Sequence, residues 1–173
     1  MIGFNRMKRV CLVTGGSRGI GKGIVKTLSK KGYKVAFTYN NKTELAQDLE
    51  NELNDNDGNV KSFQMSIEER ESVVSTIGEI NNYFNDSISV LVNNAAIDPK
   101  VKVSSNDNLS RLENFPIDQW NLEMAVGLTG AMLCSKVFGY EMAKKGKGVI
   151  LNISSDLGII APDQRIYKKD GLP

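Results

Sequence analysis

Three glycines near the start of this sequence have the spacing of a phosphate-binding loop. They occupy positions 15, 19 and 21 in the stretch T-G-G-S-R-G-I-G, which follows an apolar run and precedes a segment with helical periodicity. Glycines let the backbone turn tightly between a strand and a helix and approach a pyrophosphate, while the amides at the helix N-terminus attract its negative charge. A glycine pattern alone is a weak signal, but here the strand and the helix accompany it. The stretch predicts nucleotide binding.

The elements that must position this loop alternate along the chain. Short apolar runs typical of buried strands cover residues 9–14, 33–39, 59–64, 87–94 and 147–154. Helical patterns separate them, the longest running from about Asp118 to Lys145. Such alternation predicts an α/β fold with a doubly wound parallel sheet of the Rossmann type. Ligands of these sheets bind outside the carboxyl ends of the strands, near the point where the strand order reverses.

Two helices carry more detailed expectations. Ser66 and Glu69 have the spacing of a capping box that opens the helix after the third strand. The apolar face of that helix is expected at Val73, Val74, Ile77 and Ile80. In the longest helix, an apolar stripe is compatible with either a core or a subunit interface, so the oligomeric state stays open; its members are Leu128, Met132, Val137 and Met142.

Composition excludes several classes of function. The sequence has no histidine, which excludes Ser-His-Asp catalysis and His-containing metal sites, and we expect no metal centre. With 22 basic against 20 acidic residues, the net charge of +2 does not indicate binding to nucleic acid or a membrane surface. Cys11 and Cys134 form no C-x-x-C pair and are expected to be buried free thiols of a reducing cytosol. We therefore expect a cytoplasmic protein.

Three motifs together resemble the short-chain dehydrogenase/reductase family. The glycine spacing G-x-x-x-G-x-G with its leading threonine is similar to the family's cofactor loop. V-L-V-N-N-A-A over residues 90–96 is similar to its N-N-A-G segment, with Ala96 in place of the last glycine. V-I-L-N-I-S-S over residues 149–155 looks like its fifth strand, which ends in the active-site serine. The resemblance implies an oxidoreductase that transfers hydride between a nicotinamide and the carbonyl or alcohol carbon of a small molecule.

The resemblance also implies a set of cofactor contacts. They fall in the glycine loop, at the end of the second strand, after the third strand and after the fourth: Gly15, Ser17, Arg18, Gly19, Ile20, Gly21, Asn40, Ser66, Asn94 and Ala95. Ser66 departs from the family pattern, which has an aspartate there to hold the adenine amino group. A serine can accept a hydrogen bond but carries no charge, so a weaker adenine contact is expected.

The end of the second strand favours NADP over NAD. Enzymes that prefer NAD have an acidic residue there to accept the ribose hydroxyls, whereas residues 38–42 read T-Y-N-N-K. Arg18, with Lys42 as a second candidate, would pair with the additional 2′-phosphate. The alternative is that Arg18 is simply exposed to solvent and that the strand end is neutral toward both cofactors.

The catalytic residues match the family only in part. Ser155 matches the serine by register, with Ser154 as the fallback, although its hydroxyl would also suit a cap of the strand end. The family's supporting asparagine falls at Gly127. Tyr167 follows Ser155 by twelve residues, close to the place of the catalytic tyrosine, but Gly171 stands where the partner lysine belongs. The run K-K-D-G-L-P ends helices, so Tyr167 is a catalytic candidate that we interpret as a loop residue.

The fifth strand suggests that the fold continues. Its sequence is apolar on both faces, as in an interior strand, and no later strand follows it. We therefore expect residues 1–173 to be a single dinucleotide-binding domain that corresponds to the N-terminal two-thirds of a family member, truncated after the fifth strand and inactive by itself. The rival hypothesis is a non-catalytic nucleotide-binding remnant or assembly protein. The substrate stays open, although polar loops at 98–114 and 161–173 hint at a polar one.

Overall fold

A five-stranded parallel sheet forms the centre of the molecule. The computed structural model describes residues 9–54, 59–97 and 112–161. The strand order is β3-β2-β1-β4-β5, so the order reverses between the neighbours β1 and β4. The strands are β1 (Val10–Val13), β2 (Lys34–Tyr39), β3 (Val60–Gln64), β4 (Ile88–Asn93) and β5 (Val149–Asn152). The predicted strand runs are confirmed, each to within two residues of its ends.

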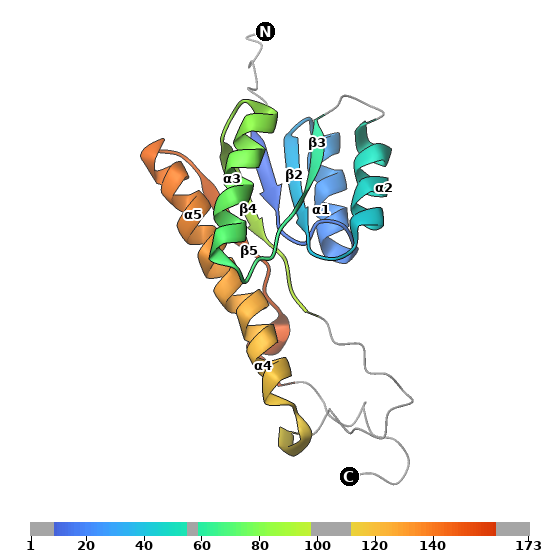
Figure 1. The fold of residues 1–173 in the computed structure, drawn as a ribbon, viewed down its shortest axis with the longest axis vertical. Helices are drawn as coiled ribbons and strands as arrows, with labels where there is room; N and C mark the ends of the chain where they lie inside the picture. The colour runs from blue at the N-terminus through green and yellow to red at the C-terminus, as the bar shows by residue number, and fades with distance from the viewer. Residues whose placement is uncertain (1–8, 55–58, 98–111, 162–173) are drawn as a thin grey trace.

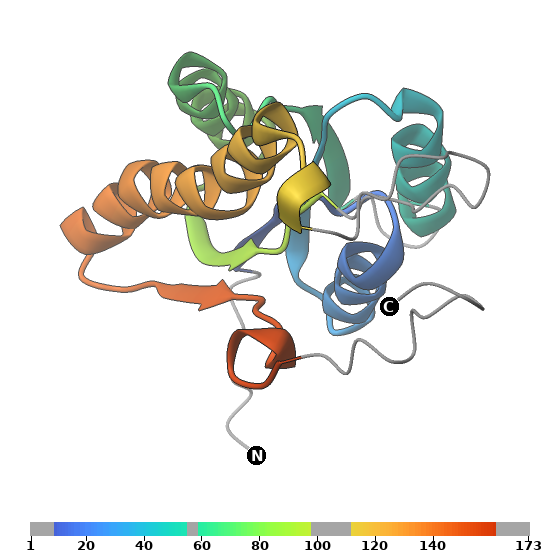
Figure 2. The ribbon, with the colours of Figure 1, turned by 90° about the horizontal axis from the view of Figure 1, so that it is seen from below.

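Helices cover both faces of this sheet. Figures 1 and 2 show α1 and α2 on one face, with α3 and α5 on the other. Their bounds are α1 (Gly19–Lys30), α2 (Thr43–Asn54), α3 (Arg70–Phe84), α4 (Ile117–Met124) and α5 (Gly130–Lys144), and a π-helical turn, η2 (Ala125–Thr129), joins α4 to α5. Short 3₁₀ turns lie at η1 (Leu112–Asn114) and η3 (Asp156–Gly158). The predicted doubly wound, Rossmann-type fold is confirmed.

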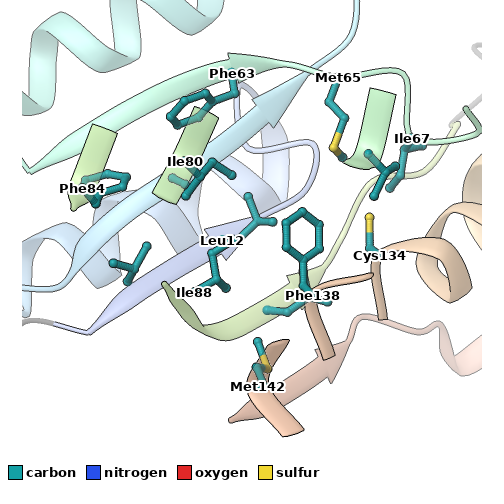
Figure 3. Packing of buried hydrophobic residues seen from close by; sticks show 14 of the residues in the cluster. Leu12, Phe63, Met65, Ile67, Ile80, Phe84, Ile88, Cys134, Phe138 and Met142 are labelled. Carbon is teal, nitrogen blue, oxygen red and sulfur yellow. The ribbon is translucent and has the colours of Figure 1, made fainter. Parts of the chain in front are cut away.

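Each face of the sheet has its own hydrophobic core. Under α1 and α2, Phe37 and Leu49 are fully buried beside the valines of β1 and β2. Under α3 and α5, Ile80 and Phe138 are fully buried against Leu12 of β1 (Figure 3). Because β1 and β2 contribute to both cores, their residues are apolar without alternation, which is the pattern that predicted interior parallel strands.

The start of α3 differs from the predicted capping box. The helix begins at Arg70, its preceding residue Glu69 is extended (φ −99°, ψ 115°), and Glu69 makes no side-chain capping bond. Ser66 instead closes a turn, since its carbonyl accepts the Glu69 N–H at 3.1 Å. The Ser66 N–H donates to Ser72 Oγ at 3.0 Å. The box prediction was wrong because this turn separates Ser66 from the helix.

The apolar face of α3 was predicted with one error. Val73 and Ile80 are buried and Ile77 packs against the same core, as expected. Val74 is 41% exposed. Residues one position apart on a helix point in directions about 100° apart, so Val73 and Val74 cannot both face the sheet.

The long helix from α4 through α5 is a core helix along its second half. Cys134, Phe138 and Met142 lie buried against the sheet, whereas Leu128 and Met132 of the predicted stripe are more than half exposed. Within the described part of the chain, Ile117–Lys144 is one stretch long and apolar enough to cross a membrane by length and composition alone. Since its inner face packs against β4 and α3, we interpret it as a helix of the globular core.

Both cysteines are buried, as the sequence predicted. Burial raises the pKa of the Cys11 thiol to about 12, with Arg9 nearby lowering it to a smaller extent. Burial likewise raises the pKa of the Cys134 thiol to about 12. Because the thiolate is the reactive form, neither side chain is suited to act as a nucleophile at neutral pH.

Candidate cofactor-binding site

The glycine loop lies between the end of β1 and the start of α1, beside the reversal of strand order. Gly15 (φ 65°) and Gly19 (φ 54°) adopt left-handed conformations that favour glycine. A Cβ on Gly15 would lie 2.9 Å from the Cα of Ala95, so a side chain there would push the loop away from the segment after β4. A Cβ on Gly19 would meet nothing within 4 Å, which leaves open space on the outer side of the loop.

Two further glycines are required by packing inside the loop. A Cβ on Gly21 would lie 2.3 Å from the carbonyl oxygen of Gly15. A Cβ on Gly16 would lie 2.5 Å from the Cβ of Phe37 on β2. The sequence analysis did not single out Gly16, because this need arises from a residue of another strand.

Thr14 and Asn94 join the loop to the end of β4. Thr14 Oγ1 accepts hydrogen bonds from the backbone N–H groups of Asn94 and Ala95, both at 3.0 Å. In return, the Asn94 side-chain amide donates to the carbonyl oxygens of Thr14 (3.0 Å) and Gly15 (3.2 Å). The structure thus brings together two motifs that the sequence analysis found 80 residues apart. These hydrogen bonds also fix the backbone path of the glycine loop and of the segment after β4.

A second threonine fastens the loop to β2. Thr38 is 2% exposed, its carbonyl accepts the Gly16 N–H at 2.9 Å, and its hydroxyl accepts the Gly15 N–H at 3.4 Å. Its part in the loop was missed by the sequence analysis. A buried polar residue near the end of an apolar strand was the available signal, because buried hydroxyls need a partner.

The candidates at the entrance of the loop differ in exposure. Ser17 is buried, whereas Arg18 is exposed and extended (φ −149°, ψ 172°) at the position that precedes α1. Ile20 is 68% exposed although it belongs to the first turn of α1, so it is not a core residue of that helix. Arg18 therefore offers an exposed guanidinium, and Ile20 an apolar surface, beside the N-terminus of α1.

The ends of β2 and β3 lie side by side. The Gln64 side chain of β3 donates to the carbonyl oxygen of Asn40 at 3.0 Å. Asn40 and Lys42 are exposed, and Ser66 is partly buried after the end of β3. No acidic residue occurs in the stretch from Thr38 to Lys42, as the sequence already indicated.

Ser155 lies beyond the end of β5, where its hydroxyl makes local contacts. Its Oγ accepts the Leu157 N–H at 3.2 Å and lies 3.2 Å from Asp156 Oδ1, to which it donates. It therefore caps η3, a role close to the capping alternative considered from the sequence. The other catalytic candidate, Tyr167, lies outside the described residues.

The predicted place of the supporting asparagine coincides with the π-helical turn. Gly127 sits within η2, and a Cβ on it would meet nothing within 4 Å. Single π-helical turns inside α-helices occur frequently at functional sites. The turn marks a place where the backbone of the long helix departs from regular hydrogen bonding near the carboxyl ends of the strands.

An asparagine network that the sequence analysis missed joins β4, β5 and α5. Asn93 is 5% exposed, and its amide nitrogen lies 2.7 Å from Asn152 Oδ1 and 3.1 Å from Ser135 Oγ. Asn152 is the last residue of β5, three positions before Ser155. The two asparagines are register partners in neighbouring strands, so they hold the carboxyl ends of β4 and β5 at one level.

Comparison with known proteins agrees with this arrangement. The family model described as short chain dehydrogenase matches residues 9–167. The chain belongs to the short-chain dehydrogenase family. Its members use nicotinamide cofactors, as the name of one relative below illustrates. The resemblance stated from the three motifs is thereby confirmed.

The matches with individual relatives include most of this chain but only about 60% of each relative's length. The 3-oxoacyl-[acyl-carrier-protein] reductase FabG of Staphylococcus aureus is 31% identical over 94% of this chain and 62% of its own. The NAD-dependent glycerol dehydrogenase of Listeria innocua is 28% identical over 94% of this chain and 59% of its own. A short chain dehydrogenase structure from Bacillus anthracis superposes with a TM-score of 0.77 at 26% identity, covering 90% of this chain and 60% of its own.

Proposed function

We propose that this chain is the cofactor-binding part of an NADP-dependent oxidoreductase that transfers hydride between nicotinamide and a carbonyl or alcohol carbon. One observation carries the proposal: the glycine loop is clamped to Asn94 and Ala95 at the reversal of strand order, where doubly wound sheets bind their ligands. The two relatives named above, a 3-oxoacyl reductase and a glycerol dehydrogenase, both carry out carbonyl or alcohol chemistry by name.

The residues of the loop fit a dinucleotide. Gly15 and Gly21 allow the loop and the first turn of α1 to pack without side chains between them, and the side of Gly19 is open. A pyrophosphate would lie against the backbone amides at the start of α1, with Ser17 and Ile20 at its edges. Asn40 and Ser66 would flank the adenosine, and Asn94 with Ala95 would border the path toward the nicotinamide. When bound, the cofactor supplies the hydride, and the protein orients it.

Arg18 supports NADP as the preferred cofactor. Its side chain is exposed at the loop, and the nearby end of β2 carries no carboxylate that would repel a 2′-phosphate. The dehydrogenase from Listeria innocua is NAD-dependent by name, so membership of the family alone does not favour NADP, and the preference proposed here rests on these local charges. NAD remains the weaker ligand in this proposal.

Fluorescence titration of the chain with NADPH and NADH tests the cofactor. We expect tighter binding of NADPH, and Arg18→Ala should weaken it by about 1–3 kcal/mol, the scale of a charge-assisted hydrogen bond, while NADH binding changes little. Lys22→Ala is the matched control, because Lys22 is a partly exposed cation one turn further along α1 that pairs with Glu52 at 3.7 Å. Equal affinity for the two cofactors in the unmodified chain would contradict the preference.

The chemical step requires residues that this chain provides only in part. Ser155 would hydrogen-bond the substrate oxygen after releasing the Leu157 N–H and Asp156, and Tyr167 is the candidate proton donor. Without a neighbouring cation, a tyrosine with a pKa near 10 transfers protons poorly at neutral pH. We therefore propose that the chain, which spans about 60% of its relatives' length, binds the cofactor but does not turn over substrate alone.

A second candidate is a nucleotide-binding protein without catalysis. Two observations favour it: Gly127 occupies the place of the supporting asparagine, and the Ser155 hydroxyl is engaged in a local turn. Assays with NADPH and a panel of ketones, aldehydes and acyl thioesters separate the candidates when run on this chain and on a version extended by the gene's downstream sequence. Turnover by the extended version supports the oxidoreductase. Cofactor binding without turnover in both supports the second candidate.

The remaining expectations follow from the same proposal. The substrate is a small carbonyl or alcohol compound, and neither nucleic acid nor a membrane is a proposed partner. A cytoplasmic location is proposed because both cysteines are free and reduced thiols suit that compartment.

A further inference from the structure

Asn93 lies at a junction of three elements beside the candidate site. It is the last residue of β4, and the next two residues, Asn94 and Ala95, bond the hydroxyl of Thr14. Its side chain reaches both β5 and the first turn of α5, which follows η2 directly. One buried residue therefore connects the segment after β4, the π-helical turn and the strand that leads to Ser155.

The side-chain nitrogen of Asn93 faces three acceptors. It lies 2.7 Å from Asn152 Oδ1, 3.1 Å from Ser135 Oγ and 3.4 Å from the carbonyl oxygen of Ala131. Because a carbonyl oxygen only accepts, the nitrogen end of this amide must face α5 and β5. The shortest of the three bonds is the one to the end of β5.

Asn93 holds the end of β5 by its backbone as well. Its carbonyl oxygen accepts the Ile153 N–H at 2.9 Å, and Asn152 is its register partner. The chain then runs through residues 153–155 into η3 (Figure 2). Ser155 is thus three residues from a position that Asn93 fixes twice. Since a hydrogen bond has a preferred length and direction, this pairing sets the level of Ser155 more closely than apolar contact would.

Stability alone does not account for an asparagine at position 93. Asn93 is 5% exposed, and among the described residues no group donates to its Oδ1, which is buried as well. Its nitrogen has two hydrogens for the acceptors that surround it. A buried amide with an oxygen left unpaired costs free energy that an apolar side chain would not. What the amide supplies instead is a bond of defined length to the neighbouring strand.

We propose that Asn93 is a positioning residue, which through Asn152 sets the place of Ser155 relative to the segment after β4. The inference rests on the proposed function, in which Ser155 bonds the substrate oxygen and the cofactor supplies the hydride. Hydride transfer needs the substrate carbon close to the nicotinamide, and a displacement of about 1 Å can cost about a hundredfold in rate. Asn93 itself touches neither substrate nor cofactor in this proposal.

The position of Ser155 can be tested without activity in the 173-residue chain. The probe is the amide proton resonance of Leu157, whose N–H donates to Ser155 Oγ. Asn152→Leu should shift or broaden this resonance, because β5 loses its side-chain bond, whereas Asn152→Asp keeps the acceptor oxygen and should leave the resonance in place. Asn54→Leu is the matched control, since Asn54 bonds Val60 at the opposite edge of the sheet, and it should not move the Leu157 resonance.

Turnover of the version extended by the gene's downstream sequence is the second readout. Asn93→Leu and Asn152→Leu should each lower kcat about tenfold or more. They should leave KM for NADPH within about twofold, because the glycine loop keeps its bonds to the segment after β4. The double variant should lose little more than either single variant and should keep its Tm, since both partners of one bond become apolar. Asn152→Asp should retain most of kcat.

The outcomes separate this inference from the proposed function. If the unmodified extended version does not turn over, the proposed function fails, and the Leu157 resonance decides whether the Asn93–Asn152 bond positions Ser155. Normal kcat in the two leucine variants, or a Leu157 resonance that does not respond to them, would overturn the inference and leave the oxidoreductase in place. A fall in kcat that follows the loss of Tm and is matched by Asn54→Leu would overturn it as well, because the role would then be structural.

Discussion

At the scale of single residues, two glycines of α1 differ in whether they leave space for a side chain. We predict that Gly21→Ala destabilises the protein by about 1–3 kcal/mol, because its Cβ would lie 2.3 Å from the Gly15 carbonyl oxygen and 2.6 Å from the Asn94 amide nitrogen. Gly23→Ala, two residues further along the same helix, meets nothing within 4 Å and should stabilise by about 0.5–1 kcal/mol. Urea unfolding curves of both variants measure the difference. Equal effects would show that the first turn of α1 can move aside.

Thr14 should matter through its hydroxyl. We predict that Thr14→Val costs about 1–3 kcal/mol, because the partly buried N–H groups of Asn94 and Ala95 lose their acceptor. NADPH binding should weaken at the same time, since the loop loses the two hydroxyl bonds to the segment after β4 and keeps only those of the Asn94 side chain and the backbone. Thr14→Ser keeps the acceptor and should restore most of both quantities. A valine variant that binds NADPH normally would argue against the clamp as part of the site.

Some individual residues of the candidate site could be predicted from the sequence, and others could not. The glycines at 15, 19 and 21 and the pair Asn94–Ala95 could be predicted, because their spacing reflects a backbone requirement. Thr38 and Asn93 could not, since their partners lie on other strands and only the fold brings them together. The Ser155 hydroxyl was predicted as a site residue, and its contacts within η3 leave its catalytic role a prediction.

At the scale of elements, Glu50 attaches α2 to β3. Burial alone would raise the pKa of its carboxyl, but hydrogen bonds from Lys61 and Ser62 outweigh this and hold the pKa below the usual value of 4.5. We predict that Glu50→Ala lowers the free energy of unfolding by about 1–3 kcal/mol at pH 7, because the Ser62 N–H loses its acceptor. Glu52→Ala, whose side chain forms exposed ion pairs with Lys22 and Lys26 on the same surface, should change it little. Chemical denaturation compares the two.

The stability of the protein at acidic pH should also report on the contacts of the Glu50 carboxyl with Lys61 and Ser62. A carboxyl whose pKa is lower in the folded state stabilises the protein above its unfolded pKa, and this contribution is lost as the pH falls through the folded value. The difference in stability between the unmodified chain and Glu50→Ala should therefore be constant near neutral pH and shrink below about pH 4.5. A difference that does not depend on pH would indicate that packing of the side chain, rather than its charge, is responsible.

Element types could be predicted from the sequence, whereas some of their ends could not. Five apolar runs and the helical patterns between them led directly to the parallel sheet, since period and turn residues are local properties. The start of α3 was misplaced because Ser66 bonds within a turn ahead of the helix. The apolar sequence of β5 led us to expect a strand with neighbours on both sides, and among the described residues it pairs with β4 alone, so this expectation stays a prediction.

At the scale of the whole molecule, the two buried thiols should make folding sensitive to alkali. Their pKa values are about 12 in the folded chain against an ordinary value of 9.0, so the unfolded chain loses these protons first as the pH rises. A group whose folded pKa is raised keeps its full contribution below the unfolded pKa and loses it above. We predict a fall in stability between pH 9 and 12 of roughly 1 kcal/mol per thiol and pH unit.

Thermal and urea unfolding at pH 8 and pH 10 would measure this fall. The double variant Cys11→Ala, Cys134→Ala should start from lower stability, because it leaves cavities in the core, but should lose less between the two pH values. Lysine and tyrosine titration is common to both proteins and cancels in the comparison. An equal loss of stability in the unmodified chain and the double variant would show that lysine and tyrosine titration, rather than the thiols, causes the alkaline sensitivity.

The attachment of Thr14 to Asn94 has a consequence for the order in which the protein folds. The two residues are 80 positions apart, so the bonds between them close a very long loop of chain and cannot form until β4 has docked beside β1. A growing polypeptide that has not yet emerged past Ala95 therefore contains the entire glycine motif without a working clamp. Nucleotide would act on refolding only after the slow pairing of distant strands, trapping the finished sheet rather than hastening its assembly.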